Sequence, residues 1–345
     1  MASTLKPEPK FERAARERQL QLTKPPGALG RLEDVACWFA ARQRREIPRA
    51  LVPAISVFAG DHGVTEENVS AFPSVVTAEM VRNFARGGAA INVLARFIEA
   101  RLTVVDVGVL ASLDDVDCIV RAKVRAGTAN LARTAAMTAT EAVAALAAGR
   151  ARALADVEAG SNLLIAGDMG IGNTTASACL VCGLTGADPE AVVGIGTGVD
   201  SEGRGRKVEV VRRALERVGR ARPNNGTGWL AEVGGLEIGA IAGYFLRAAE
   251  LGIPALVDGF IATAGALVAR AIEPSVTDWL LASHRSYETG HCIALESLGI
   301  DPLLDLGMRL GEGSGAALCV PLLQGAIRLH AEMATFAEAG VSEKE

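Results

Sequence analysis

One carboxylate stands alone in the segment DLGMRLGEGSGAAL, residues 305–318. Glu312 lies between two glycines, Leu310 precedes it, and the nearest charged side chain along the chain is Arg309. A carboxyl group in so apolar a setting is poorly hydrated, which raises its pKa and makes it a competent proton acceptor near neutral pH. A glutamate in the first turn of a helix, where the helix dipole favours negative charge, is an equally valid interpretation of this spacing.

A second candidate is the glycine-rich turn GDMGIGNTT, residues 167–175. It follows an apolar run and precedes a helical pattern, and junctions of this kind bind phosphate through backbone N–H groups and the helix dipole. A tight turn with a helix N-cap would produce a similar pattern. It is neither a Walker loop, since no lysine precedes the threonine pair, nor a full G-x-G-x-x-G. The residues expected to hold a phosphate are Gly170, Ile171, Gly172, Asn173 and Thr174.

A third glycine-rich turn, VVGIGTGVDSEGRGRK at residues 192–207, ends in a basic cluster. Arg204 and Arg206 have the spacing of a solvated helix start. Lys207 is the residue of this cluster that we expect to pair with a phosphate.

The segment SHRSYETGH, residues 283–291, offers hydroxyl groups and two histidines. We expect Ser286 to bind a phosphate or a sugar hydroxyl. His284 and His291 are seven residues apart and lack the carboxylates of a metal site, so we expect neither a metal nor a cofactor.

The amino-acid composition excludes some classes of protein. Half of the 345 residues are hydrophobic, only 4% are aromatic, and the formal net charge is −5; the mean hydropathy is +0.26. This favours a large packed core and argues against nucleic-acid binding, because stacking side chains and excess positive charge are lacking. The six cysteines are scattered, and no signal or membrane-length apolar run accompanies them. We therefore expect a reduced, cytoplasmic protein that does not enter a membrane.

Short apolar runs alternate with helical patterns along most of the chain, which is typical of a parallel sheet covered by helices on both faces. The runs expected to be strands are 54–63, 102–108, 162–173, 191–198, 254–259, 278–286 and 302–315. The expected helices are 10–22, 28–46, 138–158, 201–219, 236–250, 259–272 and 314–335. The fold class is thus α/β, with a Rossmann-like sheet over 51–313. Residues 1–50 and 314–345 are expected to form a small helical domain together.

Each polar or glycine-rich cluster follows one of the apolar runs. In folds of this type ligands bind beyond the carboxyl ends of the strands, so we expect the clusters to converge on one crevice.

Eight phrases in order resemble the nicotinate-nucleotide–dimethylbenzimidazole phosphoribosyltransferase family, over about residues 20–335. They are TKPPGALGRLE, FAGDHGV, GDMGIGNTT, GIGTGVD, EVGGLEIGAIAG, DGFIATAGAL, SHRSYETGH and LGMRLGEGSGAAL. The resemblance implies a homodimeric enzyme of cobalamin assembly. It would transfer phosphoribose from nicotinate mononucleotide to an azole nitrogen of dimethylbenzimidazole, with inversion at the anomeric carbon. It also implies that Glu312 accepts the proton and that Gly170 to Thr174 hold the phosphate.

The residues fit this reaction chemically. The pyridinium leaving group departs as a neutral ring and needs no acid, so one carboxylate is sufficient where a glycosidase requires two. In the family the glycine loop reads Gly-Glu-Met-Gly-Ile-Gly-Asn, whereas this chain has Asp168, one methylene shorter. We expect Asp168 to steady the developing ribosyl cation or the base, and its shorter reach to alter the rate or the choice of acceptor. The side chains expected to contact the aromatic ring are Phe72, Ser74, Glu79, Met169 and Leu310.

Two alternatives remain open. The chain could be a paralogue that binds nucleotide or azole without turnover, the change to Asp168 marking the loss of activity. It could also use another acceptor, such as adenine or a phenol. A dinucleotide oxidoreductase is disfavoured, because no acidic residue follows a proper fingerprint at the required distance.

Overall fold

The computed structural model describes residues 4–342 except 197, 199 and 220–222. Within these residues a six-stranded sheet has the order β3-β2-β1-β4-β5-β6, and every neighbouring pair is parallel. This confirms the expected parallel α/β fold. The strands are β1 (Pro53–Gly60), β2 (Arg101–Gly108), β3 (Val120–Arg121), β4 (Leu163–Met169), β5 (Ala255–Val257) and β6 (Leu280–Ala282).

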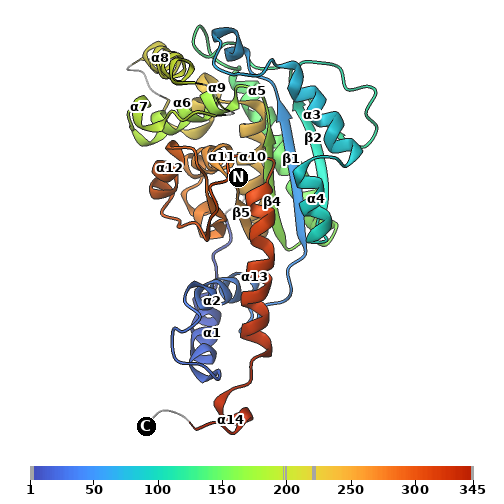
Figure 1. Cartoon of the computed structure of the whole chain (residues 1–345), viewed down its shortest axis with the longest axis vertical. Helices are drawn as coiled ribbons and strands as arrows, with labels where there is room; N and C mark the ends of the chain where they lie inside the picture. The colour runs from blue at the N-terminus through green and yellow to red at the C-terminus, as the bar shows by residue number, and fades with distance from the viewer. Residues whose placement is uncertain (1–3, 197, 199, 220–222, 343–345) are drawn as a thin grey trace.

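Helices cover both faces of the sheet, so the strands are buried on both sides (Figure 1). Along β1, Ala54 and Phe58 belong to one hydrophobic core, while Ile55 and Val57 belong to the other. The first core is completed by α5 (Ala139–Glu158), α6 (Asn173–Thr185), α9 (Gly226–Val233), α10 (Leu236–Leu251) and α11 (Phe260–Ile272). The second is completed by α2 (Arg31–Gln43), α3 (Val75–Arg86), α4 (Ala90–Phe97) and α13 (Ser314–Glu332). This double burial explains why the strands read as continuous apolar runs.

The strand order reverses between β1 and β4. From β1 the chain continues outward to β2 and β3, and it then returns to place β4 on the other side of β1. In folds of this type ligands bind at such a reversal, beyond the carboxyl ends of the strands and next to the loops that follow the two central strands. The clusters at Asp61 and at Gly170 begin in these two loops.

Two predicted strands of the main sheet are wrong. In 191–198 the described residues form the end of α7 (Pro189–Val192) and irregular backbone, with residue 197 outside the described part. In 302–315 only β8 (Leu304–Asp305) is a strand, and it pairs with β7 (His284–Arg285) in a separate two-stranded sheet. A short apolar run does not distinguish a strand from a buried helix end or loop.

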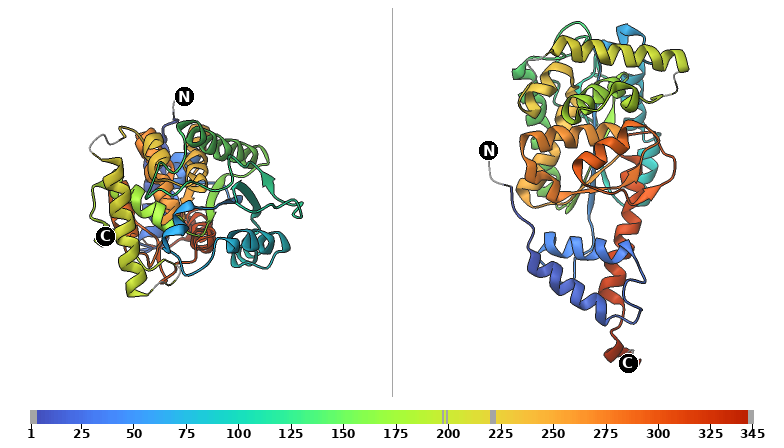
Figure 2. Two further views of the ribbon diagram at one scale, coloured as in Figure 1. Left: turned by 90° about the horizontal axis from the view of Figure 1, so that it is seen from above. Right: turned by 90° about the vertical axis from the view of Figure 1, so that its left-hand side faces the viewer.

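The N-terminal helices and the C-terminal part of the chain lie side by side below the sheet (Figures 1 and 2). Gln19 Nε2 in α1 (Pro9–Gln21) lies 2.8 Å from His330 Nδ1 in α13. Leu22 and Thr335 form a β-bridge just beyond. The tail helix α13 and the segment after it thus contact the N-terminal helix α1 and the residue that follows it. The remaining elements are α8 (Ser201–Val218), α12 (Gly290–Leu298), α14 (Phe336–Ala339) and the 3-10 helices Gly63–Glu67 and Pro274–Trp279.

Candidate active site

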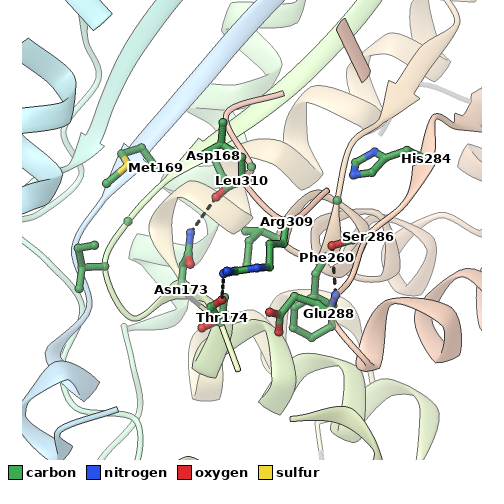
Figure 3. Close-up of a pocket in the computed structure, with 16 residues that line it drawn as sticks. Asp168, Met169, Asn173, Thr174, Phe260, His284, Ser286, Glu288, Arg309 and Leu310 are labelled. Carbon is green, nitrogen blue, oxygen red and sulfur yellow. Dashed lines mark hydrogen bonds between the residues drawn. The ribbon is translucent and has the colours of Figure 1, made fainter. Parts of the chain in front are cut away.

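The glycine loop after β4 packs directly on the loop after β1. A side chain at Gly170 would place its Cβ 2.3 Å from the carbonyl oxygen of Gly60, so only glycine fits there. Gly172 has a φ of 96°, a left-handed conformation that glycine adopts readily. Backbone N–H groups were expected to bind the phosphate, but those of Asn173 and Thr175 already donate to the carbonyls of Gly170 and Gly172. The side chains of Asn173 and Thr174 instead line the cavity (Figure 3).

A buried ion pair supports this loop from behind. His62 Nε2 lies 2.7 Å from Glu237 Oε1, and both side chains are fully buried. Burial opposes the charge on His62, but the Glu237 carboxylate outweighs it and raises the pKa of the imidazole. The ring fits only because its neighbour is glycine, since a Cβ at Gly235 would come 2.5 Å from His62 Cε1. The charged pair thus sits at the point where the sheet reverses its order.

Lys207 reaches the glycine loop from α8. Its Nζ donates to Thr174 Oγ1 at 2.7 Å, and the side chain is only 1% exposed. Burial lowers the pKa of Lys207 to about 8, against the opposing effect of the Glu288 carboxylate. Its helix neighbours Arg204 and Arg206 form ion pairs with glutamates on the outer surface. Lys207 is therefore the cation of this helix that is available to a ligand at Thr174.

The opposite wall of the cavity comes from the segment after β6. Ser286 lines the cavity, and its backbone N–H donates to His291 Nδ1 at 2.8 Å. His291 Nδ1 is thus an acceptor, and burial lowers the pKa of this ring to about 3, so the histidine is neutral. Glu288 and His284 line the same wall.

Glu312 occupies a tight loop at the start of α13. Its φ of 63° lies in the left-handed region, as do those of Gly311 and Gly313 on either side. Such a conformation costs a non-glycine residue about 1 kcal/mol or more and is concentrated at functional sites. A Cβ at Gly167 would come 2.3 Å from the carbonyl oxygen of Glu312, so the loop lies directly on β4.

The Glu312 residue is 4% exposed, and its Oε2 accepts the N–H of Ile91 at 3.4 Å, in the first turn of α4. Burial raises the pKa of Glu312, the Ile91 hydrogen bond opposes this, and Asp258 adds to the increase. Asp258 also accepts the N–H groups of Gly313 and Ala316, at 3.2 and 2.8 Å. It therefore both holds the loop in place and makes Glu312 a better base near neutral pH.

Asp168 faces the cavity at the end of β4. Burial, followed by the nearby Asp258 and Glu237 carboxylates, raises its pKa well above the usual range, although Asn173 Nδ2 donates to it at 2.9 Å. A Cβ at Gly311 would lie 3.0 Å from Asp168 Oδ1, so the Glu312 loop closely approaches this carboxyl group.

Most of the residues singled out from the sequence meet in one cavity (Figure 3). Those that line it are Asp168, Met169, Gly170, Ile171, Asn173, Thr174, Ser286 and Leu310. Lys207 reaches Thr174, and Glu312 follows the lining residue Gly311.

Phe72, Ser74 and Glu79, which are expected to contact the aromatic ring, are not among the residues that line the cavity. Phe72 and Glu79 are exposed, and Ser74 Oγ donates to Thr65 Oγ1 at 3.1 Å. Their contact with an aromatic ring stays a prediction.

Sequence reasoning overlooked five side chains of the cavity as ligand-binding groups: Phe260, Ile261, His284, Glu288 and Arg309. Two of them lie in the segment 283–291, whose position after an apolar run was the available signal.

Comparison with known proteins places the chain in a family. A phosphoribosyltransferase family model matches residues 5–341. The chain belongs to this family. The nicotinate-nucleotide–dimethylbenzimidazole phosphoribosyltransferase of Chromobacterium violaceum is 66% identical over 332 residues, 96% of each chain. Its namesake from Pseudomonas aeruginosa is 52% identical over 339 residues, which is 98% of this chain and 96% of the relative.

Solved phosphoribosyltransferase structures share the fold. CobT from Thermus thermophilus superposes with a TM-score of 0.94 and 52% identity, covering 97% of this chain and all of that one. A second structure, named as the same nucleotide phosphoribosyltransferase from that organism, gives a TM-score of 0.93 and 51% identity, covering 98% of this chain and all of that one.

In the described part of this phosphoribosyltransferase, no three His, Cys, Asp or Glu side chains are grouped to hold a metal ion. Across the same residues, every helix is too short or too polar to cross a bilayer.

Proposed function

We propose that this protein transfers 5-phosphoribose from nicotinate mononucleotide to dimethylbenzimidazole, giving α-ribazole phosphate and free nicotinate. The reaction makes it a glycosyltransferase of cobalamin nucleotide assembly. Relatives of this name align over nearly the whole chain at 52% and 66% identity. The observation that carries the proposal at the site is a buried Glu312 beside a cavity lined on one side by a glycine loop.

The donor side would hold the phosphate. Lys207, bound to Thr174, and Arg309, whose Nη1 donates to the carbonyl of Gly196 at 3.1 Å, supply positive charge on this side of the cavity. A fixed phosphate orients the ribose, and such positioning accounts for a large part of catalysis when reacting atoms are held near contact. The pyridinium then leaves as its bond to the anomeric carbon breaks, and the electron pair of that bond returns to the ring nitrogen.

Glu312 would act on the incoming base. One azole nitrogen forms the new bond to the anomeric carbon with its lone pair, and the N–H proton on the other nitrogen passes to the Glu312 carboxylate. The raised pKa of Glu312 makes it a stronger base than an exposed glutamate. Asp168, at the floor of the cavity, would stabilise the positive charge that develops on the ribose when it is ionised.

The acceptor side would consist of Leu310 and Met169 together with Phe72, Ser74 and Glu79. Leu310 is 55% exposed and Phe72 is 48% exposed, so this wall is open. An open apolar wall can accommodate aromatic rings of different shapes.

A competition assay tests the proposal. Dimethylbenzimidazole, benzimidazole, adenine and a phenol are offered together with nicotinate mononucleotide, and the products are separated by chromatography. We expect α-ribazole phosphate to be the main product. A main product that carries adenine or a phenol would show that the preferred acceptor is not dimethylbenzimidazole. Donor binding without any product would favour a non-catalytic paralogue.

We also propose that the enzyme works as a homodimer in the cytoplasm. All six cysteines are unpaired, as expected in a reducing compartment. The contacts between α1 and α13 support a small domain made from residues 1–50 and 314–345, next to a catalytic domain at 51–313. Light scattering on the purified protein tests the dimer, and a monomer at micromolar concentration would contradict it.

A further inference from the structure

Glu288 is a buried carboxylate with no partner. It lies between β7 and α12, lines the cavity and is 5% exposed. Among the described residues, no group forms a hydrogen bond to either of its oxygens. Leaving a carboxylate buried and unsatisfied is energetically costly, and such groups in folded proteins call for a specific explanation.

The surrounding structure holds this side chain in place. The Glu288 N–H donates to Ser286 Oγ at 3.3 Å, and its carbonyl accepts the N–H of His291 at 3.0 Å. A Cβ at Gly194 would come 2.3 Å from Glu288 Oε2, so one side of the carboxylate packs against bare backbone. Figure 3 shows it directed toward the cavity beside Thr174 and Phe260.

The chemistry of the carboxylate limits its ligand. An ionised carboxylate only accepts hydrogen bonds, so its partner must supply donors, which an ionised phosphate lacks. Lys207 and Arg309, in contrast, only donate. The matching ligand carries an anion for the cations and hydroxyl groups for Glu288, as a sugar phosphate does.

We propose that Glu288 accepts a hydrogen bond from a ribose hydroxyl of the donor and thereby selects ribonucleotides over deoxyribonucleotides. This inference rests on the proposed phosphoribosyl transfer. A site built to bond a hydroxyl discriminates strongly against the analogue without it, because the protein group is then left unpaired.

A competing role for Glu288 is that of a counter-charge for Lys207. Its negative charge favours the protonated lysine, although neither of its oxygens is hydrogen-bonded to the lysine in the described structure. In that role, loss of the charge would weaken every phosphate-bearing donor equally. The two roles therefore differ in how the effect depends on the sugar.

The test combines one change in the protein with one change in the ligand and compares their separate and joint effects. Wild type and Glu288→Gln are assayed with nicotinate mononucleotide and its 2′-deoxy and 3′-deoxy analogues, with the same acceptor. We expect the substitution to lower kcat/KM for the ribonucleotide by on the order of 10- to 100-fold, as for a hydrogen bond to a charged group. We expect little further loss for the analogue that lacks the contacted hydroxyl. Differences in intrinsic reactivity cancel, because each analogue is compared on both proteins.

Several outcomes overturn the inference. Equal losses of kcat/KM for all three donors would mean that Glu288 acts as a counter-charge for Lys207. No loss for any donor would mean that Glu288 takes no part in donor binding. Turnover of the ribonucleotide by wild type is measured first, and its absence would contradict the proposed function instead.

Two controls keep the test independent of folding. Glu296→Gln makes the same chemical change on an exposed residue of α12 and is expected to leave all rates unchanged. We expect the Tm of empty Glu288→Gln to equal or exceed that of wild type, since an unpaired buried charge is removed. Titration of the wild type with each nucleotide, without acceptor, gives a second readout. Equal Kd values for the ribonucleotide and both analogues would also contradict the inference.

Discussion

The donor and acceptor sides of the cavity differ in how completely they are built. On the donor side Lys207 is 1% exposed and bonded to Thr174, and the glycine loop rests on a buried ion pair. On the proposed acceptor side the lining residue Leu310 is about half exposed, as is Phe72, which lies apart from the lining and is only predicted to contact the ring. A preorganised cradle binds one ligand class with little reorganisation, whereas an open apolar wall tolerates several ring shapes. If the proposed assignment of the two sides holds, we expect the protein to be selective for its donor and to accept several aromatic rings.

Glu312 lies between the two sides, and its removal should have the largest effect. Glu312→Gln keeps the size of the side chain but cannot accept the azole proton, so we expect turnover to fall on the order of 10²- to 10⁴-fold. Product formation and calorimetric titration of the donor measure the two sides separately. Donor affinity should be preserved, and Glu332→Gln on the exposed part of α13 serves as the control. A fully active Glu312→Gln would contradict the assignment of the base.

Lys207 tests the donor side alone. Because its pKa is lowered to about 8, the charge that binds phosphate should be lost as the pH rises through this value. We expect kcat/KM for the donor to decline above about pH 8 in wild type. Lys207→Met should lose about 10- to 100-fold in kcat/KM, as for a charge-assisted hydrogen bond, and should no longer show this decline.

Arg206→Met, one residue earlier on the outer surface, is the matched control for Lys207→Met. If kcat/KM of Lys207→Met still declined at alkaline pH as in wild type, a group other than Lys207 would be responsible for the decline.

Asp258 allows a more precise comparison of the two sides, because it holds the loop that carries Glu312. Asp258→Asn removes a negative charge that raises the pKa of Glu312, so the acid limb of the pH–rate profile should move to lower pH. It also weakens the hydrogen bonds to the start of α13, and we expect a loss of about 1–2 kcal/mol in the free energy of unfolding. Thermal melts and pH profiles measure both effects. Asp301→Asn, at an exposed carboxylate, should change neither.

The smallest effects on activity are expected for substitutions in the open apolar wall on the acceptor side. Truncating half-exposed side chains removes little buried surface, so Phe72→Ala and Leu310→Ala should change the acceptor KM by only about 2- to 10-fold. The donor KM should stay constant, while the preference among competing acceptors shifts. A larger effect on the donor than on the acceptor would reverse the assignment of the two sides.

Local patterns predicted much of the site. Gly170 to Thr174 and Lys207 were recognisable because a turn followed by a helix, or a lysine inside a basic helix start, is encoded within a few residues. Glu288 was overlooked, because the position of its segment after an apolar run does not show which side chain faces the cavity or lacks a partner. The helices α3 and α4 were also missed, although Ile91 in α4 donates to the carboxylate of Glu312.

The amino-acid sequence by itself determined the class of the fold, because strands buried on both faces read as apolar runs between helical repeats. It also showed Glu312 as an isolated carboxylate and led to the prediction that the glycine loop binds an anion. The sequence predicted that the clusters after the strands converge, but only the tertiary structure decided how closely Asp168, Lys207, Glu288 and Glu312 approach one another. Their distances depend on the order of the strands and on contacts between segments far apart in the chain, such as Asp258 with Ala316. Such contacts arise from packing of the whole molecule, and no local pattern records them.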